Sequence, residues 1–511
     1  MDEFSTIILL PGAASDHHHL DHSIATGRPG PPLPWGRGRR CLAWQAYSWS
    51  VTAVGAARMP PVRLGQPSAK LTKMPDPSVS YFATTNFHNV FTPFGIKQAD
   101  RLMHVYAIGK TGVGKSTLIE TLALGDMQAG RGFALIDPHG DLVERVRDAA
   151  SPTQRERMVY LDAADPEQPY GYNPLRRIRD DKIPLAASGL LEAMRKIWPD
   201  AWGVRMEHVL RNSLFALLER DGSTLPDVLR LYSDKVFRKQ VAARIRNDVV
   251  RAYWTQEFAK YSDRQRAEAV APIQNKLGAL LTDPRLYNVL VAPKVDIRFR
   301  RLMDDGGMLL VNLAKGRLGE DGATVLGGLI VSTIGLAALS RAEMPQAERR
   351  PFFLYVDEFQ TFTTLSFVNM MAELRKYGVG LTLAHQHLHQ LEPDIRHAVL
   401  GNAGTLISFR VGSEDAGILA SEFQPRFEVL DLLSLANRDI YLKLMIDGTP
   451  SRPFSAQTLP SSVRAQHSQS LPSASTGSAP VFGRQSPKFP TGLTVETQAK
   501  GGPKKQPRGR Q

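Results

Sequence analysis

One run of the sequence has the spacing of a phosphate-binding loop. Residues 109–116 read GKTGVGKS, which is the pattern G-x-x-x-x-G-K-S. Glycines at these positions let backbone N–H groups converge on phosphate oxygens, and a helix that starts at the last residues adds its positive end. Lys115 would reach the β- and γ-phosphates of ATP, and the Ser116 hydroxyl would coordinate Mg²⁺. The predicted nucleotide-binding residues are Gly109, Lys110, Thr111, Gly112, Val113, Gly114, Lys115, Ser116 and Thr117.

A pair of carboxylates follows a second apolar run, FFLYV at 352–356. Asp357, at the carboxyl end of the expected strand, would hold Mg²⁺ together with Ser116. Glu358 would act as the catalytic base that polarises the attacking water. The alternative is a solvated pair of carboxylates at the end of a strand. The phosphate-binding loop elsewhere in the chain favours the catalytic interpretation.

Two further segments place polar residues after apolar runs. Gln386 ends the run GLTLAHQ and would orient the attacking water or contact the γ-phosphate; a loop glutamine bonded to the backbone is the alternative. The segment from Asp137 to Asp141, DPHGD, follows the apolar run 132–136. Its carboxylates would either lie near the nucleotide or start a helix, whose dipole favours Asp141 in the first turn. We assign this segment no chemical role.

The elements that must position these residues alternate between strands and helices. A helix over 116–124, ended by Gly125, is expected after the loop, and strands are expected at 102–108, 132–136, 308–313, 352–356, 380–384, 405–410 and 440–446. Such alternation predicts an α/β fold with a mostly parallel sheet, in which ligands gather at the carboxyl ends of the strands. A polar-tipped strand between the loop strand and the Asp357 strand indicates a RecA-like P-loop core.

The chain between Lys115 and Asp357 is longer than a compact core requires. Helical spacing of apolar residues indicates that the excess is an inserted all-α subdomain at 183–295, between core segments at 74–182 and 296–460. Residues 1–73 are rich in Pro, Gly and Arg and predict a disordered or non-native leader. Residues 461–511 predict a disordered basic tail.

Composition excludes some classes of protein and leaves others open. The single cysteine rules out a disulfide framework and a cysteine-ligated zinc site. The net charge of +13 lies mostly in the two ends, so it gives little support for a nucleic-acid partner by itself. No transmembrane segment is convincing, because the run 41–57 is short and polar and the run 325–339 is typical of a buried core helix.

At these residues the sequence resembles the coupling ATPases of type IV secretion and conjugation (TraD/TraG type), within the HerA/FtsK-like motors. The resemblance covers roughly residues 80–460. It is carried by HVYAIGKTGVGKSTLI, FALIDPHGDL, FFLYVDEFQTF and LRKYGVGLTLAHQHLHQL, and more weakly by GNAGTLISFRVGSEDA. It implies a homo-hexameric ring, an all-α subdomain at one mouth and passage of DNA through the centre.

The resemblance also implies a role for Arg375, at the end of the helix expected after Asp357. In the similar ATPases an arginine at this place reaches the γ-phosphate of the neighbouring subunit. The alternative is a cation favoured at the C-terminus of a helix, and Arg410 is the substitute candidate for the trans-acting arginine. Relaxase or type IV secretion components are the implied partners. Because membrane-bound relatives carry N-terminal helices that are not evident here, we expect a cytoplasmic protein, with peripheral attachment to the inner membrane as the alternative.

Three functions remain open at this point. The first is an ATP-hydrolysing ring motor that moves DNA during transfer between cells. The second is an ATPase that energises protein secretion or complex assembly without touching DNA. The third is a nucleotide switch without sustained turnover, which Glu358 disfavours because a switch does not need a catalytic base.

Overall fold

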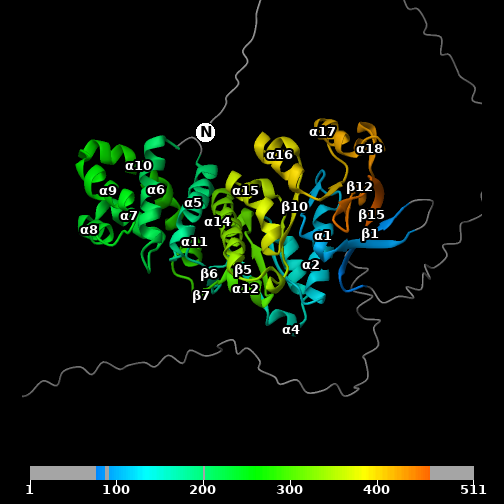
Figure 1. Ribbon diagram of the computed structural model, residues 1–511, viewed down its shortest axis with the longest axis horizontal. Helices are drawn as coiled ribbons and strands as arrows, with labels where there is room; N and C mark the ends of the chain where they lie inside the picture. The colour runs from blue at the N-terminus through cyan, green and yellow to red at the C-terminus, as the bar shows by residue number, and fades with distance from the viewer. Residues whose placement is uncertain (1–75, 87–90, 199–201, 461–511) are drawn as a thin grey trace, which may run out of the picture. The chain divides into compact units, whose positions relative to one another are not determined.

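The computed structural model describes residues 76–86, 91–198 and 202–460. The predictions for 1–73 and 461–511 therefore concern residues outside the described ranges. Within those ranges the fold is built on one 11-stranded sheet. Its strands, in spatial order, are β2 (Pro93–Lys97), β1 (Val79–Thr85), β15 (Phe454–Thr458), β12 (Asp439–Lys443), β11 (Thr405–Ser408), β3 (Val105–Ile108), β10 (Val379–His385), β9 (Phe352–Val356), β4 (Gly132–Asp137), β8 (Met308–Asn312) and β5 (Met158–Asp162) (Figure 1).

The sheet has a parallel part and an antiparallel part. From β11 to β5 every neighbouring pair is parallel, whereas β12, β15, β1 and β2 pair antiparallel at the other side. All residues of β3, β4, β8, β9 and β10 are buried, which is the pattern of parallel strands covered on both faces. The predicted mostly parallel RecA-like sheet is confirmed, with β10 between β3 and β9.

Two sequence-based expectations for the elements were wrong in detail. The helix after the loop, α2 (Lys115–Gln128), runs through Gly125 and ends at Gln128, with Ala129 as its C-cap. The next residue, Gly130, adopts a left-handed conformation with φ of 67°, so Gly130 rather than Gly125 provides the helix stop. The expected strand 440–446 is divided into β12 and a short strand, β13 (Met445–Ile446), which pairs with β14 (Thr449–Pro450).

A group of helices occupies the chain between the short strands β6 (Tyr170–Gly171) and β7 (Val295–Asp296), which pair with each other. The helices are α5 (Ile183–Ile197), α6 (Val204–Leu218), α7 (Leu225–Ser233), α8 (Lys235–Ala242), α9 (Asp248–Ala252), the π-helix η3 (Tyr253–Glu257), α10 (Asp263–Thr282) and α11 (Pro284–Leu290). Tyr232, Trp254 and Phe258 form the aromatic centre of α6–α10, with ring centroids of Trp254 and Phe258 4.9 Å apart.

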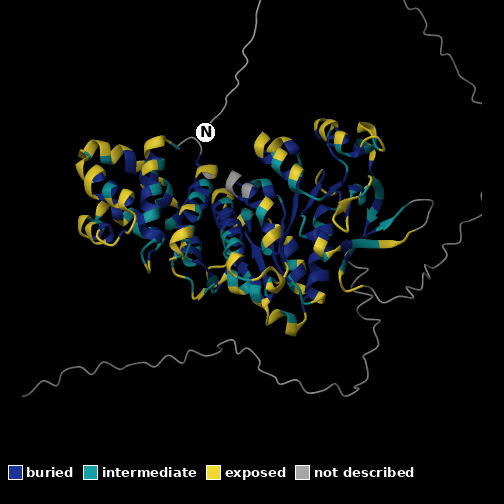
Figure 2. Cartoon of the chain, in the orientation of Figure 1, coloured by how far each residue is buried: buried dark blue, intermediate teal, exposed yellow. Residues whose placement is uncertain are grey.

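The remaining helices cover the sheet. They are α1 (Gln98–Arg101), α3 (Asp141–Asp148), α4 (Pro152–Arg155), α12 (Phe299–Asp305), α13 (Lys315–Leu318), α14 (Glu320–Leu339), α15 (Leu365–Leu374), α16 (Pro393–Asn402), α17 (Ser413–Phe423) and α18 (Val429–Ser434). Figure 2 shows that buried residues run continuously through the sheet and α14, whereas exposed residues lie on the outer helices.

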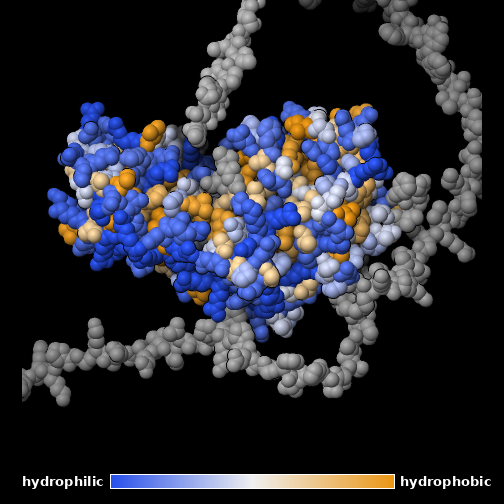
Figure 3. Space-filling model, in the orientation of Figure 1, coloured by the Kyte–Doolittle hydropathy of each residue, from blue (hydrophilic) through white to orange (hydrophobic). Residues whose placement is uncertain are grey.

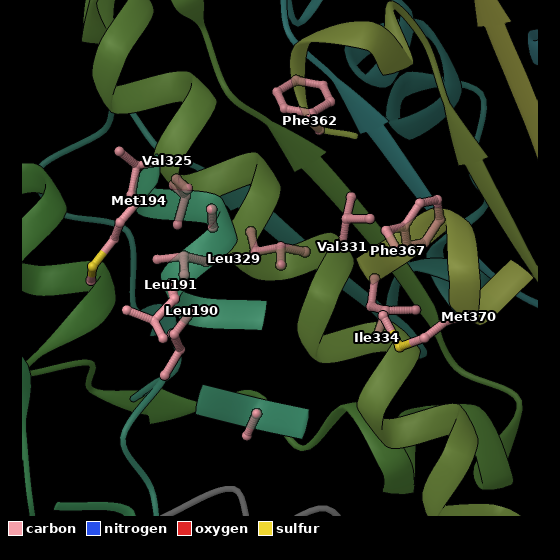
Figure 4. Close-up of a cluster of buried hydrophobic side chains, with 14 of the residues drawn as sticks. Leu190, Leu191, Met194, Val325, Leu329, Val331, Ile334, Phe362, Phe367 and Met370 are labelled. Atoms are coloured by element: carbon pink, nitrogen blue, oxygen red, sulfur yellow. The ribbon is translucent and has the colours of Figure 1, made fainter. Parts of the chain in front are cut away.

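The apolar helix α14 packs between α5 and α15 (Figure 4). Gly327 allows a close contact, because a Cβ there would lie 2.4 Å from the Phe362 ring, whereas a Cβ at the adjacent Gly328 would make an ordinary contact of 3.6 Å with Ala193 of α5. Among the described residues, one helical stretch, 320–343, is long and apolar enough to cross a membrane by length and composition, and 67% of its most apolar window is buried inside the fold. The predicted buried core helix at 325–339 is therefore confirmed.

Candidate nucleotide-binding site

The loop between β3 and α2 has the backbone conformation that a phosphate cradle needs. Gly112 and Gly114 have φ values of 77° and 120°, a region that side chains strongly disfavour. A Cβ at Gly109 would lie 2.5 Å from the Cβ of Phe409, so only glycine fits against the neighbouring strand end. The loop is also tied to that strand, since the Lys110 N–H donates to the Arg410 carbonyl at 2.9 Å.

Lys115 is buried, with 6% of its surface exposed, in the first turn of α2. Its ammonium donates to the carbonyls of Gly109 at 2.5 Å and Lys110 at 3.0 Å, so the charge lies over the loop itself. Burial lowers the pKa of Lys115, and the carboxylates of Asp357 and Glu358 partly oppose this shift. The cation is thus desolvated and faces the concave side of the loop, where an anionic phosphate would restore favourable charge pairing.

The next residue of the helix, Ser116, contacts the carboxylate predicted to share a metal ion with it. Its hydroxyl donates to Asp357 Oδ2 at 2.8 Å. Burial raises the pKa of Asp357 to about 6, and the nearby carboxylates of Asp137 and Glu358 add to the effect. A buried carboxylate with this deficit of positive charge is well suited to a divalent cation, and Mg²⁺ commonly takes one or two protein ligands plus phosphate oxygens and water. No group of three or more His, Cys, Asp or Glu suited to a metal occurs in the described ranges.

Glu358 is held by two glutamine side chains. The Gln386 amide donates to Oε1 of Glu358, and the Gln360 amide donates to Oε2 at 2.6 Å. The Thr111 hydroxyl of the loop in turn donates to the Gln386 carbonyl oxygen at 2.6 Å. Glu358 itself has a φ of 48°, a strained conformation for a non-glycine residue. This conformation changes the direction of the side chain from the one it would have if β9 continued. A continuous hydrogen-bonded path therefore joins the loop to the predicted base.

The sequence analysis missed Gln360, which lies only two residues beyond Glu358. No spacing rule marks it, because its role depends on the tight turn that follows β9, the 3₁₀ helix η7 (Phe359–Thr361). The structure brings the remaining predicted residues together: Thr111, Lys115 and Ser116 come from the loop and α2, Asp357 and Glu358 follow β9, and Gln386 follows β10.

A buried charge cluster fixes α2 against β9 below the site. The Arg101 guanidinium donates to both carboxylate oxygens of Asp126, at 2.8 and 2.9 Å, and to the Tyr355 hydroxyl at 2.5 Å. Asp126 lies in α2 and Tyr355 lies two residues before Asp357. All three side chains are almost fully buried. Removing one partner of such a buried pair typically costs about 3–5 kcal/mol, so the relative position of Ser116 and Asp357 is strongly determined.

Asp137 starts a helix. Its carboxylate accepts the backbone N–H groups of His139 at 2.9 Å and Leu142 at 2.8 Å, at the beginning of α3. Asp141 is exposed in the first turn of that helix. Because Asp137 is also close enough to Asp357 to raise the pKa of that carboxyl, its charge contributes to the site from one strand away.

The three arginines near the core take different positions. Arg375 is exposed in the 3₁₀ helix η8 (Arg375–Tyr377), which precedes β10. Gln386 lies beyond the other end of this seven-residue strand, about 20 Å away at the usual rise per residue. Arg375 therefore lies at the opposite edge of the sheet from the nucleotide site of its own chain. It forms no side-chain hydrogen bond or ion pair within residues 76–86, 91–198 and 202–460.

Arg410 and Arg438 lie beside the loop. The Arg410 guanidinium donates to the Leu435 carbonyl and to Asn437, both at 3.0 Å, so its hydrogen bonds are committed within the chain. The Arg438 N–H donates to the Val113 carbonyl at 2.8 Å, and its side chain lies against Gly114. Sequence reasoning missed Arg438, because no motif surrounds it and only the antiparallel return of β12 brings it to the loop.

Comparison with known proteins finds similarity in one segment and in the fold. Residues 351–422 match the TraG-D_C family, described as the TraM recognition site of TraD and TraG. No curated protein sequence matches the chain. Two solved structures share its fold at 15% sequence identity. The bacterial conjugative coupling protein TrwBdeltaN70 aligns over 76% of this chain and 89% of its own, with a TM-score of 0.51.

The second structure, VirB4 of Thermoanaerobacter pseudethanolicus, aligns over 77% of this chain and 100% of its own, with a TM-score of 0.52. The plasmid coupling protein TrwB has also been solved in complex with ADP and Mg²⁺, and that form covers 72% of this chain at a TM-score of 0.50. The chain therefore shares the RecA-like fold of these coupling and type IV secretion proteins, and its residues 351–422 match the TraG-D_C family.

Proposed function

We propose that the chain is an ATP-hydrolysing ring motor that moves DNA for type IV secretion or conjugative transfer. The observation that carries the hydrolytic part is the hydrogen-bonded path from Thr111 through Gln386 to Glu358, beside the Ser116–Asp357 pair. The complex of the similar TrwB with ADP and Mg²⁺ supports the choice of a magnesium nucleotide as ligand.

Each residue then has a chemical task. The loop N–H groups and Lys115 bind the phosphates, and Ser116 and Asp357 hold Mg²⁺, which draws charge from the phosphate oxygens when bound. Glu358 accepts a proton from the water whose oxygen attacks the γ-phosphorus, while ADP leaves. Gln386 and Gln360 orient the Glu358 carboxylate, and the hydrogen bond from Thr111 lets Gln386 respond to the state of the loop.

The assembly and the cargo are supported by the family match and the shared fold. We propose a homo-hexamer in which Arg375 acts on the nucleotide of a neighbouring subunit, since Arg375 is exposed and far from its own site. We assign the helices of 183–295 to an inserted subdomain. The TraM-recognition description of the matched family favours DNA-processing partners, such as a relaxase, and type IV secretion components. A place in the cytoplasm, with peripheral contact to the inner membrane, fits these partners.

ATP turnover with and without DNA tests the proposal. The purified full chain should hydrolyse ATP, and single-stranded or duplex DNA should increase its turnover. Glu358→Gln measured in parallel reports any contaminating ATPase. A turnover that DNA does not change, in a chain that also does not bind labelled oligonucleotides, would favour the alternative of an ATPase for protein secretion or complex assembly.

A further inference from the structure

A cavity of ≈ 470 Å³ lies among α8, α9, η3 and α10, away from the nucleotide site. Five basic side chains line it and no acidic side chain does. They are Lys235, Arg238, Lys239, Arg251 and Arg266. Residues 235–266 carry nine Lys and Arg against three Asp and Glu, a net charge of +6. Figure 3 shows hydrophilic side chains covering much of this helical group on the face drawn. We call this cavity the cationic pocket.

The arginines at the base of the cationic pocket are held close to one another by the fold. Arg238 and Arg266 both lie over the Phe258 ring, with guanidinium carbons 5.3 and 5.5 Å from its centroid. Arg238 also donates to the Leu231 carbonyl at 2.8 Å. Burial lowers the pKa of Arg238, and the charge of Arg266 lowers it further. Two guanidinium groups thus share one ring and repel each other, and the charge of Asp234 offsets part of this effect at Arg238.

Acidic residues near the cationic pocket pair with two of its five cations, but none of these acidic residues lines the pocket. Asp234 caps the start of α8 and pairs with Arg230 outside the pocket. Asp248 pairs with Arg251, and Asp263 pairs with Arg266 at 3.5 Å. The Arg266 Nε is buried and has no hydrogen-bond partner in the described part of the chain. The pocket is therefore lined by one buried donor without a partner and by three cations, Lys235, Arg238 and Lys239, that form no ion pair in the described ranges.

The exposed lysines extend this charge along one helix face. Lys235 and Lys239 lie one turn apart on α8, with no side-chain hydrogen bond or ion pair among the described residues. Four residues of helix span about 6 Å along the helix axis, which is roughly two axial steps of one duplex strand at ~3.4 Å each. An isolated phosphate would need only the arginines at the base, whereas a repeating polyanion would use the lysines as well. Paired guanidiniums bind phosphate oxygens in bidentate geometry.

We propose that the cationic pocket binds the phosphate backbone of a nucleic-acid strand through Lys235, Lys239 and the Arg238–Arg266 pair. This inference rests on the proposed DNA cargo and names a site for it outside the ATPase core. The contact is to phosphates, so it positions the strand without reading its bases.

The test measures binding of a fluorescein-labelled oligonucleotide, single-stranded and duplex, by anisotropy over a series of salt concentrations. Lys235→Gln/Lys239→Gln should raise the Kd about tenfold at low salt and reduce the salt slope for duplex DNA by about 1.8, since each phosphate contact contributes about 0.9. Thr255→Glu, which places a negative charge on an exposed position of the pocket lining, should weaken binding without removing any basic residue.

The matched control is Arg264→Gln/Lys294→Gln, which removes two positive charges elsewhere. Arg264 is 90% exposed and lies two residues from Arg266, about 200° around α10, and Lys294 is 69% exposed. The control should bind like the parent. Turnover of ATP without DNA should be the same in all variants, because none of these residues touches the nucleotide site.

Several outcomes would overturn the assignment. Parental affinity in both pocket variants, or an equal loss in the control, would show that the cationic pocket is not the strand's site while leaving the proposed cargo intact. Displacement of the oligonucleotide by an equal concentration of inorganic phosphate would indicate a small-anion site, and stronger displacement by polyglutamate would indicate an acidic protein partner. A parent chain that binds no oligonucleotide and shows no DNA-stimulated turnover would remove the proposed cargo itself.

Discussion

The nucleotide site and the cationic pocket handle charge in opposite ways. At the nucleotide site, Lys115, Asp357 and Glu358 are buried or half-buried and each contacts partners from the same chain. At the cationic pocket, Lys235 and Lys239 have no such partners in the described ranges and the two central arginines repel each other. The first arrangement holds a geometry before any ligand arrives, as catalysis requires. The second leaves an excess of positive charge that an anionic ligand would relieve.

Arg375 extends this comparison to a third location, because it is exposed and unpaired like the pocket lysines but is proposed to serve the nucleotide site of a neighbour. We expect Arg375→Ala to bind ATP yet lose about 10³–10⁵-fold in turnover, the usual contribution of a trans-acting arginine. Mixed with Lys115→Ala protein, which keeps the arginine but lacks a working site, it should recover part of the activity. ATP turnover of the mixture measures this.

The matched control for Arg375 is Lys376→Ala. Lys376 is the next exposed cation of the same turn and pairs with Glu373 at 3.0 Å, so its loss should leave turnover nearly unchanged. Normal turnover of Arg375→Ala, or mixed rings that form without recovery, would refute the assignment. Arg410 would then be the next arginine to test, although its guanidinium would first have to leave Leu435 and Asn437.

Glu358→Gln tests the nucleotide site, whose side chains are held in place before any ligand binds. The substitution keeps the size of the side chain but removes the base, so kcat should fall about 10²–10⁴-fold while ATP still binds. Gln360→Ala provides a graded companion, because it removes one of the two amides that hold Glu358 and should lower kcat less. Steady-state kinetics with ATP measures both. Parental kcat in Glu358→Gln would show that another group accepts the proton.

Substitution of Asp357 should show by how much its buried charge lowers the free energy of unfolding. Its pKa is raised to about 6 in the folded chain, whereas an unfolded aspartate titrates near 3.9. Between these values the folded chain keeps a proton that the unfolded chain has released, so the free energy of unfolding falls as pH rises from about 4 to about 6. Without nucleotide or Mg²⁺, Asp357→Asn should therefore exceed the parent in stability at pH 7, by up to about 3 kcal/mol.

Thermal unfolding over pH 4–8 measures this difference, which should close near pH 4. Asp141→Asn is the control, since that exposed carboxylate has no buried charge to relieve and should gain nothing. A gain for Asp357→Asn that stays constant across the pH range would show that burial of the charge is not its cause.

The smallest expected effect concerns the lysines of the cationic pocket. Lys235→Gln/Lys239→Gln should stabilise the DNA-free chain slightly, by less than about 1 kcal/mol, because it relieves repulsion at the surface. The gain should shrink in high salt, which screens exposed charges. Arg264→Gln should instead lose a few tenths of a kcal/mol, since Arg264 pairs with Glu268 one turn along α10. Melting temperatures at low and high salt measure both, and destabilisation of the lysine variant would contradict the comparison.

Sequence reasoning succeeded where chemistry is local in the chain. The loop at 109–116 and the run FFLYVDE carry their own signals, and buried parallel strands such as β9 read as continuous apolar runs. Gln360 and Arg438 were not predicted from the sequence, because a turn brings the first to the site and an antiparallel strand brings the second. The strands β1 and β2, at the antiparallel end of the sheet, were not predicted because their residues are only partly apolar. The cationic pocket was not predicted because its excess of positive charge is local. Over the whole core, acidic segments offset the basic residues of this one segment, so the total charge is small.

The paired glycines of α14 have a mechanical consequence. Phe362 follows Glu358 by four residues and presses directly on Gly327, while the adjacent Gly328 faces Ala193 of α5. At Gly327 the backbone of α14 meets the Phe362 ring with no side chain of its own between them. A shift of the segment after Glu358 would therefore reach the backbone of α14 directly at this point. Gly327→Ala would place a Cβ 2.4 Å from the Phe362 ring and force the two segments apart, whereas Gly328→Ala would make an ordinary contact of 3.6 Å with Ala193.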